Sequence, residues 1–193
     1  MKIILASKSG VRKKILQEND IEFDVVPSQV DEDMTKESLL NEGADPLSIS
    51  KNLAELKAIK VSKSYPDQLI LGADSVISLY DELINKPKTR KEAFEIMTKL
   101  NGKIHYLISS VCFAKNGSMV WNYSEKSELK MKQINKKQII SYLERIPTTT
   151  LLAYGVYQVE ADGKELFESI KGDKNSIMGL PIEQIKQYIK NYK

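Results

Sequence analysis

The sequence predicts an α/β fold in which helices flank a central twisted sheet. Apolar runs of strand length alternate along the chain with helical patterns that begin at recognisable caps. The composition, 41% hydrophobic and 28% charged with 6 Pro and 9 Gly, is typical of a globular protein and excludes collagen-like and wholly disordered chains. A length of 193 residues suffices for one substantial core, so we expect one domain over residues 1–193.

The expected elements follow one another with short connections. In chain order they are a strand over 2–6, a helix over 11–18, a strand over 21–26, a helix over 46–62, extended segments over 69–73 and 76–80, a helix over 89–100, a hairpin of 104–114 with 118–132, a helix over 136–144, an extended segment over 154–160, a strand over 166–170 and a last helix from Pro181.

Caps and apolar stripes justify the first helices. Ser9 and its neighbours offer hydroxyls that can cap a helix directly after the first strand. The three acidic residues 31–33 are expected in a polar loop, which leads to Asp45-Pro46. Proline at the first helical position favours a helix start there, and Ile49 and Leu53 begin its apolar stripe.

Local signals also fix the later elements. The run Leu69 to Ala73 indicates a buried strand, with Asp74 at a break after it. Thr89 and Glu92 have capping-box spacing, which predicts the helix that follows. Asn116-Gly117 is a strong hairpin signal, and a turn is expected at residues 162–163.

Several function classes are excluded or disfavoured. The single cysteine, Cys112, lies in an apolar run and is expected to be buried filler, and the single histidine, His105, has no partner for a zinc site. Any bound metal must therefore be coordinated by carboxylates. No apolar run approaches a membrane-spanning length and the start lacks a signal region, so we expect a cytoplasmic protein with no membrane partner. The net charge of +3 is dispersed, which gives no support to nucleic-acid binding.

The segment from Ser7 to Arg12 could bind an anion, because hydroxyls, a guanidinium and free backbone N–H groups gather where a strand feeds a helix. The alternative is that Ser9 is only a cap and Arg12 only a solvated residue of the first turn. Glu32, in the acidic run, could hold a divalent cation or be merely solvated. Lys57 lies on the flank of an apolar helix face, from which its ammonium could reach a ligand or snorkel to water.

Asp74 is the most suggestive single residue, because it follows a buried strand at the edge where ligands gather in open α/β sheets. It could instead simply end the strand in a turn. Lys86, held by Pro87, adds a third cation to Arg12 and Lys57. Two acidic positions with three cations favour a polyphosphate bound with a metal, and phosphoryl cleavage needs charge neutralisation and a positioned water more than a covalent nucleophile.

These residues resemble the Maf family of nucleotide pyrophosphatases, which belongs with the inosine triphosphatase-like folds. The resemblance covers nearly the whole chain in eight ordered pieces: LASKSGVR at 5–12, VDE at 30–32, LAELKA at 53–58, LGADS at 71–75, INKP at 84–87, LNGKIH at 100–105, YQVE at 157–160 and IKGDKNSIMGLP at 170–181. It implies an elongated α/β fold with a central mixed sheet and an active-site cleft between two lobes.

The resemblance also implies an activity and a site. Family members use a divalent cation, Mg²⁺ or Mn²⁺, and hydrolyse a nucleoside triphosphate between its α- and β-phosphates, which removes non-canonical nucleotides. Carried over by position, Asp74 is the catalytic acid/base or metal carboxylate and Glu32 is its metal partner. The implied phosphate contacts are Ser7, Arg12, Lys57 and Lys86.

Three departures from the family pattern concern the base. Val11 replaces the first arginine of the usual Ser-Pro-Arg-Arg, and Ser75 replaces the Thr of the dTTP/UTP branch and the Gln of the 7-methyl-GTP branch. Glu160 is similar to the glutamate of the 7-methyl-GTP branch. Because a carboxylate accepts hydrogen bonds from guanine N1–H and N2–H, a 7-methyl-GTP-type substrate is favoured.

A nucleotide-binding regulator of septum formation and cell division is the alternative, because the family name derives from that association. The retained Glu32, Lys57, Asp74 and Lys86 favour the enzyme, since a pure binder has no need of a carboxylate beside the scissile phosphate. The sequence leaves the oligomeric state open between monomer and homodimer.

Overall fold

A mixed sheet of seven strands forms the centre of the computed structural model, which describes residues 1–159 and 161–192. Its order is β2-β1-β3-β5-β6-β7, with β4 paired to β3 beside this path. Strand β1 pairs in parallel with β2 and β3, and the other pairs are antiparallel. The strands are β1 (Ile3–Leu5), β2 (Phe23–Val25), β3 (Ile70–Leu79), β4 (Glu82–Ile84), β5 (Ile104–Lys115), β6 (Ser118–Met131) and β7 (Phe167–Lys171).

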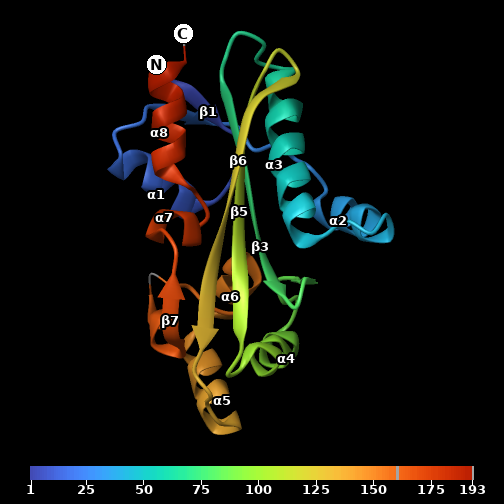
Figure 1. The fold of residues 1–193 in the computed structure, drawn as a ribbon, viewed down its shortest axis with the longest axis vertical. Helices are drawn as coiled ribbons and strands as arrows, with labels where there is room; N and C mark the ends of the chain where they lie inside the picture. Colours follow the sequence, from blue (N-terminus) through green and yellow to red (C-terminus); the bar gives the residue numbers. More distant parts are fainter. Residues whose placement is uncertain (160, 193) are drawn as a thin grey trace.

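Helices cover both sides of this sheet. They are α1 (Gly10–Glu18), α2 (Glu32–Asn41), α3 (Pro46–Ser62), α4 (Arg90–Leu100), α5 (Lys136–Arg145), α6 (Thr148–Tyr154), α7 (Lys174–Ile177) and α8 (Ile182–Asn191), with a 3₁₀ turn, η1, at Asp162–Leu166. In Figure 1, α3 lies along one side of the upper sheet and α1 and α8 along the other, while α4 and α5 close the lower end. None of the helices in the described ranges is long and apolar enough to cross a membrane.

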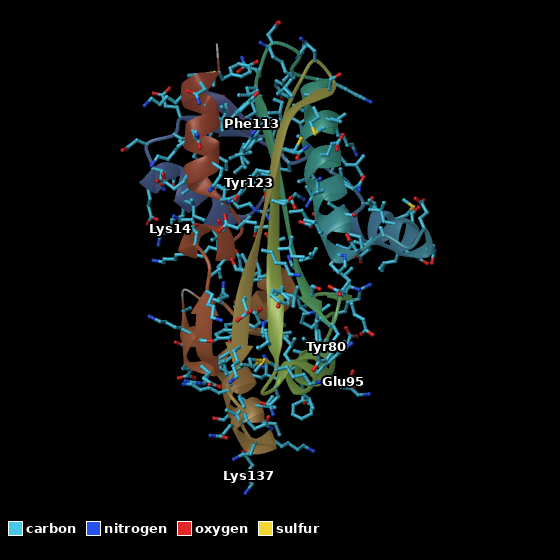
Figure 2. All side chains as sticks on the ribbon, in the orientation of Figure 1. Lys14, Tyr80, Glu95, Phe113, Tyr123 and Lys137 are labelled. Atoms are coloured by element: carbon cyan, nitrogen blue, oxygen red, sulfur yellow. The ribbon has the colours of Figure 1, made fainter. Side chains whose placement is uncertain are left out.

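The molecule is elongated because β3, β5 and β6 run through most of its length (Figure 1). Their upper parts pack with α1, α3 and α8, and their lower parts pack with α4, α5, α6 and β7. Figure 2 shows the two ends: Phe113 and Tyr123 lie in the upper half, whereas Tyr80, Glu95 and Lys137 lie at the lower end. Separate apolar clusters thus form two lobes on a shared set of strands, and the predicted α/β fold is confirmed.

The predicted helix starts are confirmed by their caps. Ser9 accepts a hydrogen bond from the Arg12 N–H, and Asp45 accepts one from the Ser48 N–H beside Pro46. Thr89 caps α4, and α5 begins with a full capping box. Each cap satisfies a backbone donor that the first helical turn leaves free, which is why these starts could be predicted from local sequence.

Three predictions were wrong. Asp74 does not stand at a break: β3 continues through it because Asp74 pairs with Ser110 in the long ladder to β5. The acidic residues open α2, where Asp31 is the cap, instead of lying in a loop. The expected extended segment over 154–160 is also absent, because α6 ends at Tyr154 and the described residues 155–159 form neither strand nor helix. Glu160 lies outside the described residues.

Gly72 lets α3 approach β3 closely. A Cβ atom at Gly72 would stand 2.1 Å from the Ala54 carbonyl oxygen and 2.7 Å from the Ala58 backbone nitrogen, and both belong to α3. These backbone atoms cannot move aside without shifting the helix. The absence of a side chain at Gly72 therefore sets the spacing between α3 and the strand that carries Asp74.

We predict that Gly72→Ala lowers the free energy of unfolding by about 3 kcal/mol, because the added methyl group forces α3 away from the sheet. Ala73→Gly, the neighbouring position on β3, is the control and should cost about 1.5 kcal/mol through backbone entropy and the loss of one buried methyl group. Urea denaturation followed by circular dichroism measures both. A Gly72→Ala protein as stable as the control would contradict the close packing.

Candidate active site

A cavity of about 460 Å³ opens between the two lobes. Its wall comes from the β1–α1 connection, the start of α2, the middle of β3, the segment after β4, the segment after α6, and the connection from α7 to α8. Eight of the nine residues predicted to form the site line this cavity: Ser7, Val11, Arg12, Glu32, Lys57, Asp74, Ser75 and Lys86. Residues far apart in the sequence therefore meet where the two lobes join.

Lys57 is buried and ion-paired, so it does not snorkel to water. Its ammonium lies 2.7 Å from Asp74 Oδ1 and 2.8 Å from Glu32 Oε1. The Lys57 side chain is 6% exposed and that of Asp74 is also 6% exposed, whereas that of Glu32 is 43% exposed. One buried cation thus holds two carboxylates from different elements at the cavity wall.

The two carboxylates keep acceptor capacity. Asp74 Oδ2 is buried and has no hydrogen-bond partner among the residues that the structure describes. Burial alone would raise the pKa of Glu32, but the charge and hydrogen bond of Lys57, aided by Lys36 and Lys86, lower it below the ordinary value. Glu32 is therefore a carboxylate at neutral pH.

This pair fits a hard divalent cation such as Mg²⁺. Such an ion takes one or two protein carboxylates and fills its remaining positions with water and phosphate oxygens. Within residues 1–159 and 161–192, no group of three or more His, Cys, Asp or Glu side chains is arranged to hold a metal by itself. Asp74 Oδ2, buried without a partner, and the half-exposed Glu32 are the available ligands, and the substrate's phosphates would have to complete the coordination.

Arg12 connects three parts of the site. Its guanidinium donates to the carbonyl oxygens of Ala73 and Gly179 at 2.9 and 3.0 Å, and to the hydroxyls of Ser7 and Ser75 at 3.3 and 3.1 Å. The pKa of Arg12 is lowered by burial, an effect that the charges of Asp74 and Glu32 oppose. Arg12 is therefore not the solvated first-turn residue of the alternative interpretation, and most of its donors already bind protein.

Lys86 lines the cavity from the segment after β4. Its ammonium donates to the Ala153 carbonyl oxygen at 2.8 Å, in the last turn of α6. Burial and the positive charge of Arg12 both lower the pKa of Lys86. The charges of Glu32 and Asp74 act in the other direction on Lys86, but Lys57 already pairs with both carboxylates. Arg12 and Lys86 thus leave positive charge at the cavity that favours an anion.

The residues expected to read the base have different surroundings. The Ser75 hydroxyl shares a hydrogen bond of 3.0 Å with Ser109 and accepts one from Arg12. Val11 packs against the apolar cluster of the upper lobe that contains Ile15, Leu180 and Ile185. The prediction for Glu160 concerns a residue outside the described ranges.

Sequence reasoning missed Ser109 and Gly179, which support Ser75 and Arg12. Ser109 lies in the middle of an apolar strand, where one hydroxyl gives no signal of its own. Gly179 has φ of 100°, and a Cβ there would stand 3.0 Å from the Ser75 hydroxyl, so a glycine is required at this position. The glycine before Leu180-Pro181 was the one sequence signal that could have indicated a turn close to the site.

Comparisons with known proteins show the family of this chain. The family described as Maf-like protein matches residues 2–192. A nucleoside triphosphate pyrophosphatase from Pelagibacter ubique is 56% identical over 97% of this chain and 96% of its own length. A 7-methyl-GTP pyrophosphatase from Brucella abortus is 36% identical over 94% of this chain and 92% of its own length. The chain belongs to the Maf family.

A solved structure from Mycobacterium abscessus, described as a nucleoside-triphosphatase or dITP/XTP pyrophosphatase, is similar with a TM-score of 0.44 and 12% identity. The alignment covers 98% of this chain and 92% of that one.

We predict that Arg12→Met lowers the free energy of unfolding by about 2 kcal/mol, because it leaves the Gly179 carbonyl without its side-chain donor and the Ala73 carbonyl with only the longer bond from Lys57. Lys86→Met is the matched control, since it removes a cavity cation with a single protein contact, and it should cost no more than about 1 kcal/mol. Urea midpoints compare the two. Equal midpoints would show that Arg12 is no more structural than Lys86.

Proposed function

We propose that this chain hydrolyses a nucleoside triphosphate to the monophosphate and diphosphate, with Mg²⁺ or Mn²⁺ as cofactor. The observation that carries the proposal is Asp74, whose Oδ2 atom is buried without a partner at the wall of a cavity that Arg12, Lys57 and Lys86 also line. The names of the Pelagibacter and Brucella relatives support the reaction. None of the relatives described above is named as a regulator of cell division, so we retain the enzyme over that alternative.

Charge neutralisation is the first task of such a site. A triphosphate brings several negative charges, and cleavage between its α- and β-phosphates leaves further charge on the departing diphosphate. We assign Arg12 and Lys86 to the phosphate oxygens, with Ser7 as a hydroxyl donor. Lys86 would exchange the Ala153 carbonyl for a phosphate oxygen, and this exchange lets it approach the substrate without a change of fold.

Asp74 and Glu32 would hold the divalent cation. When bound, that ion supplies charge neutralisation at the phosphates and lowers the pKa of a coordinated water. Oδ1 of Asp74 is already held by Lys57, so Oδ2 is the one oxygen atom left for either role: it would coordinate the ion, or it would accept a proton from the attacking water where Glu32 and the phosphates hold the ion. Lys57 therefore fixes the direction of the Asp74 carboxylate during the reaction.

We further propose that the base is a modified guanine of the 7-methyl-GTP type. Its support is the identity of Glu160 and the name of the Brucella relative. Val11 and Ser75, which line the cavity, are assigned to the nucleoside end of the substrate. We also propose one domain over residues 1–193 that acts in the cytoplasm as a monomer or a homodimer.

We predict that the wild type releases diphosphate from one or more nucleoside triphosphates when Mg²⁺ or Mn²⁺ is present, and that Asp74→Asn lowers kcat by about two orders of magnitude or more. The amide keeps the volume of the carboxylate but loses its charge and its ability to take a proton. Diphosphate release measured over a panel of nucleotides tests both statements, and circular dichroism controls for folding. A folded Asp74→Asn variant with the wild-type rate would remove Asp74 from the mechanism.

We predict that Glu160→Gln shifts the ratio of kcat/KM for 7-methyl-GTP over dTTP by about tenfold toward dTTP. Glutamate only accepts hydrogen bonds, so it pairs with guanine donors and repels the acceptor oxygens of a pyrimidine, whereas glutamine can donate. Glu165→Gln, an exposed position paired with Arg145, is the control. A wild type that prefers dTTP, or a ratio that Glu160→Gln leaves unchanged, would remove Glu160 from base selection.

A further inference from the structure

The segment over residues 155–159 forms part of the cavity wall without regular secondary structure of its own. Among the described residues, its backbone bonds are local: the Gly155 N–H donates to Leu151 at the end of α6, and the Ala161 N–H donates to Gln158. No hydrogen bond in these ranges ties its backbone to the sheet. Side chains must therefore fix its position.

Tyr157 connects this segment to the core of the lower lobe. It lines the cavity, yet it is 6% exposed and packs edge-on against Phe167 of β7 with 4.9 Å between ring centroids. Its hydroxyl lies 2.8 Å from Nε2 of His105. Tyr157, like Val156 beside it, thus belongs both to the cavity wall and to the apolar core, but Tyr157 adds a hydrogen bond to a strand.

His105 is the fixed end of this contact. It lies on β5, where it pairs with Leu129 of β6, and it is fully buried. Burial lowers the pKa of His105 to about 4, so the ring is neutral at pH 7 and holds one N–H. Burial also raises the pKa of Tyr157, which keeps its hydroxyl protonated. One neutral hydrogen bond therefore links a rigid strand to the segment, whichever partner donates.

We propose that His105 is a positioning residue for nucleotide binding, which acts through Tyr157 to hold the cavity-lining segment 155–159 in place. His105 does not itself line the cavity, so it cannot reach the substrate. The expected effect on nucleotide binding rests on the proposed function, whereas the effect on the position of the segment concerns the protein without a ligand. The cost of losing the hydrogen bond falls on binding, because the chemistry takes place at Asp74 on another strand.

The chain offers a matched control for the Tyr157 hydroxyl. Tyr142 of α5 lies in the same apolar cluster and is 2% exposed, but its buried hydroxyl has no partner in the described ranges and it does not line the cavity. Tyr157→Phe and Tyr142→Phe each remove one oxygen atom from one lobe. Within the described ranges, only Tyr157→Phe removes a hydrogen bond between the segment and the sheet.

Hydrogen exchange of the nucleotide-free protein tests the structural part. In Tyr157→Phe, the hydrogen-bonded amides at the two ends of the segment, those of Gly155 and Ala161, should exchange at least about fivefold faster than in wild type, since the loss of one hydrogen bond permits an opening of that size. In Tyr142→Phe the same amides should exchange as in wild type. Equal exchange in the two variants would overturn the proposal, and this result does not depend on whether any nucleotide is hydrolysed.

Kinetics with the best triphosphate test the functional part. Tyr157→Phe should raise KM about fivefold with kcat within about threefold of wild type, and His105→Leu combined with Tyr157→Phe should add little to the single change. His105→Leu should raise KM like Tyr157→Phe, and His105→Gln, whose amide can reach the same hydroxyl, should bring KM most of the way back to the wild-type value.

If Tyr157→Phe lowers the melting temperature but keeps the wild-type KM, or changes neither, His105 has no positioning role in nucleotide binding and serves stability alone. A wild type without triphosphate hydrolysis would overturn the proposed function and leave hydrogen exchange to decide on the segment.

Discussion

The buried ion pair between Lys57 and Asp74 is the interaction on which the rest of the site depends. A charged group buried without a partner is costly, so each member requires the other to stay in place. Their 2.7 Å contact joins α3 to β3, and α3 can approach that strand closely because Gly72 has no side chain. Glu32 then meets the same ammonium, which brings the start of α2 to the cavity. The packing of a glycine and the pairing of charges thus place both proposed metal ligands.

The two-lobed shape gives this arrangement its access to a ligand. Strands β3 and β5 pass from one lobe to the other, so Asp74 in the middle of β3 lies where the lobes meet rather than at a sheet edge (Figure 1). Arg12 fastens the upper wall through Ala73 and Gly179, and His105 holds Tyr157 in the lower wall. The lower wall also has a charged hydrogen bond, from Lys86 to the Ala153 carbonyl, but the segment over residues 155–159 is held by the neutral bond of Tyr157. This segment is therefore the part of the wall that opens most easily.

Local signals made much of this fold predictable, and long-range pairing accounts for what was missed. Helix starts at Pro46 and Arg90 follow from caps within four residues, and the hairpin follows from Asn116-Gly117. The expected break at Asp74 failed because a polar residue inside a strand resembles a strand end until its partner on β5 is known. Most candidate site residues could be named from sequence, but the burial of Lys57 could not, since nothing near it in the sequence reveals that Asp74 and Glu32 neutralise it.

The charges of the cavity explain why a polyanion suits it better than a neutral ligand. Arg12 and Lys86 are both partly desolvated, and the charge of Arg12 contributes to the lowered pKa of Lys86, so the two cations raise each other's free energy. Asp74 and Glu32 offset this repulsion only partly, because Lys57 already binds both carboxylates. A triphosphate between Arg12 and Lys86 would relieve the repulsion, and a divalent cation would supply the positive charge that two carboxylates and a phosphate chain then require. Substrate and metal are therefore expected to bind more favourably together than either does alone.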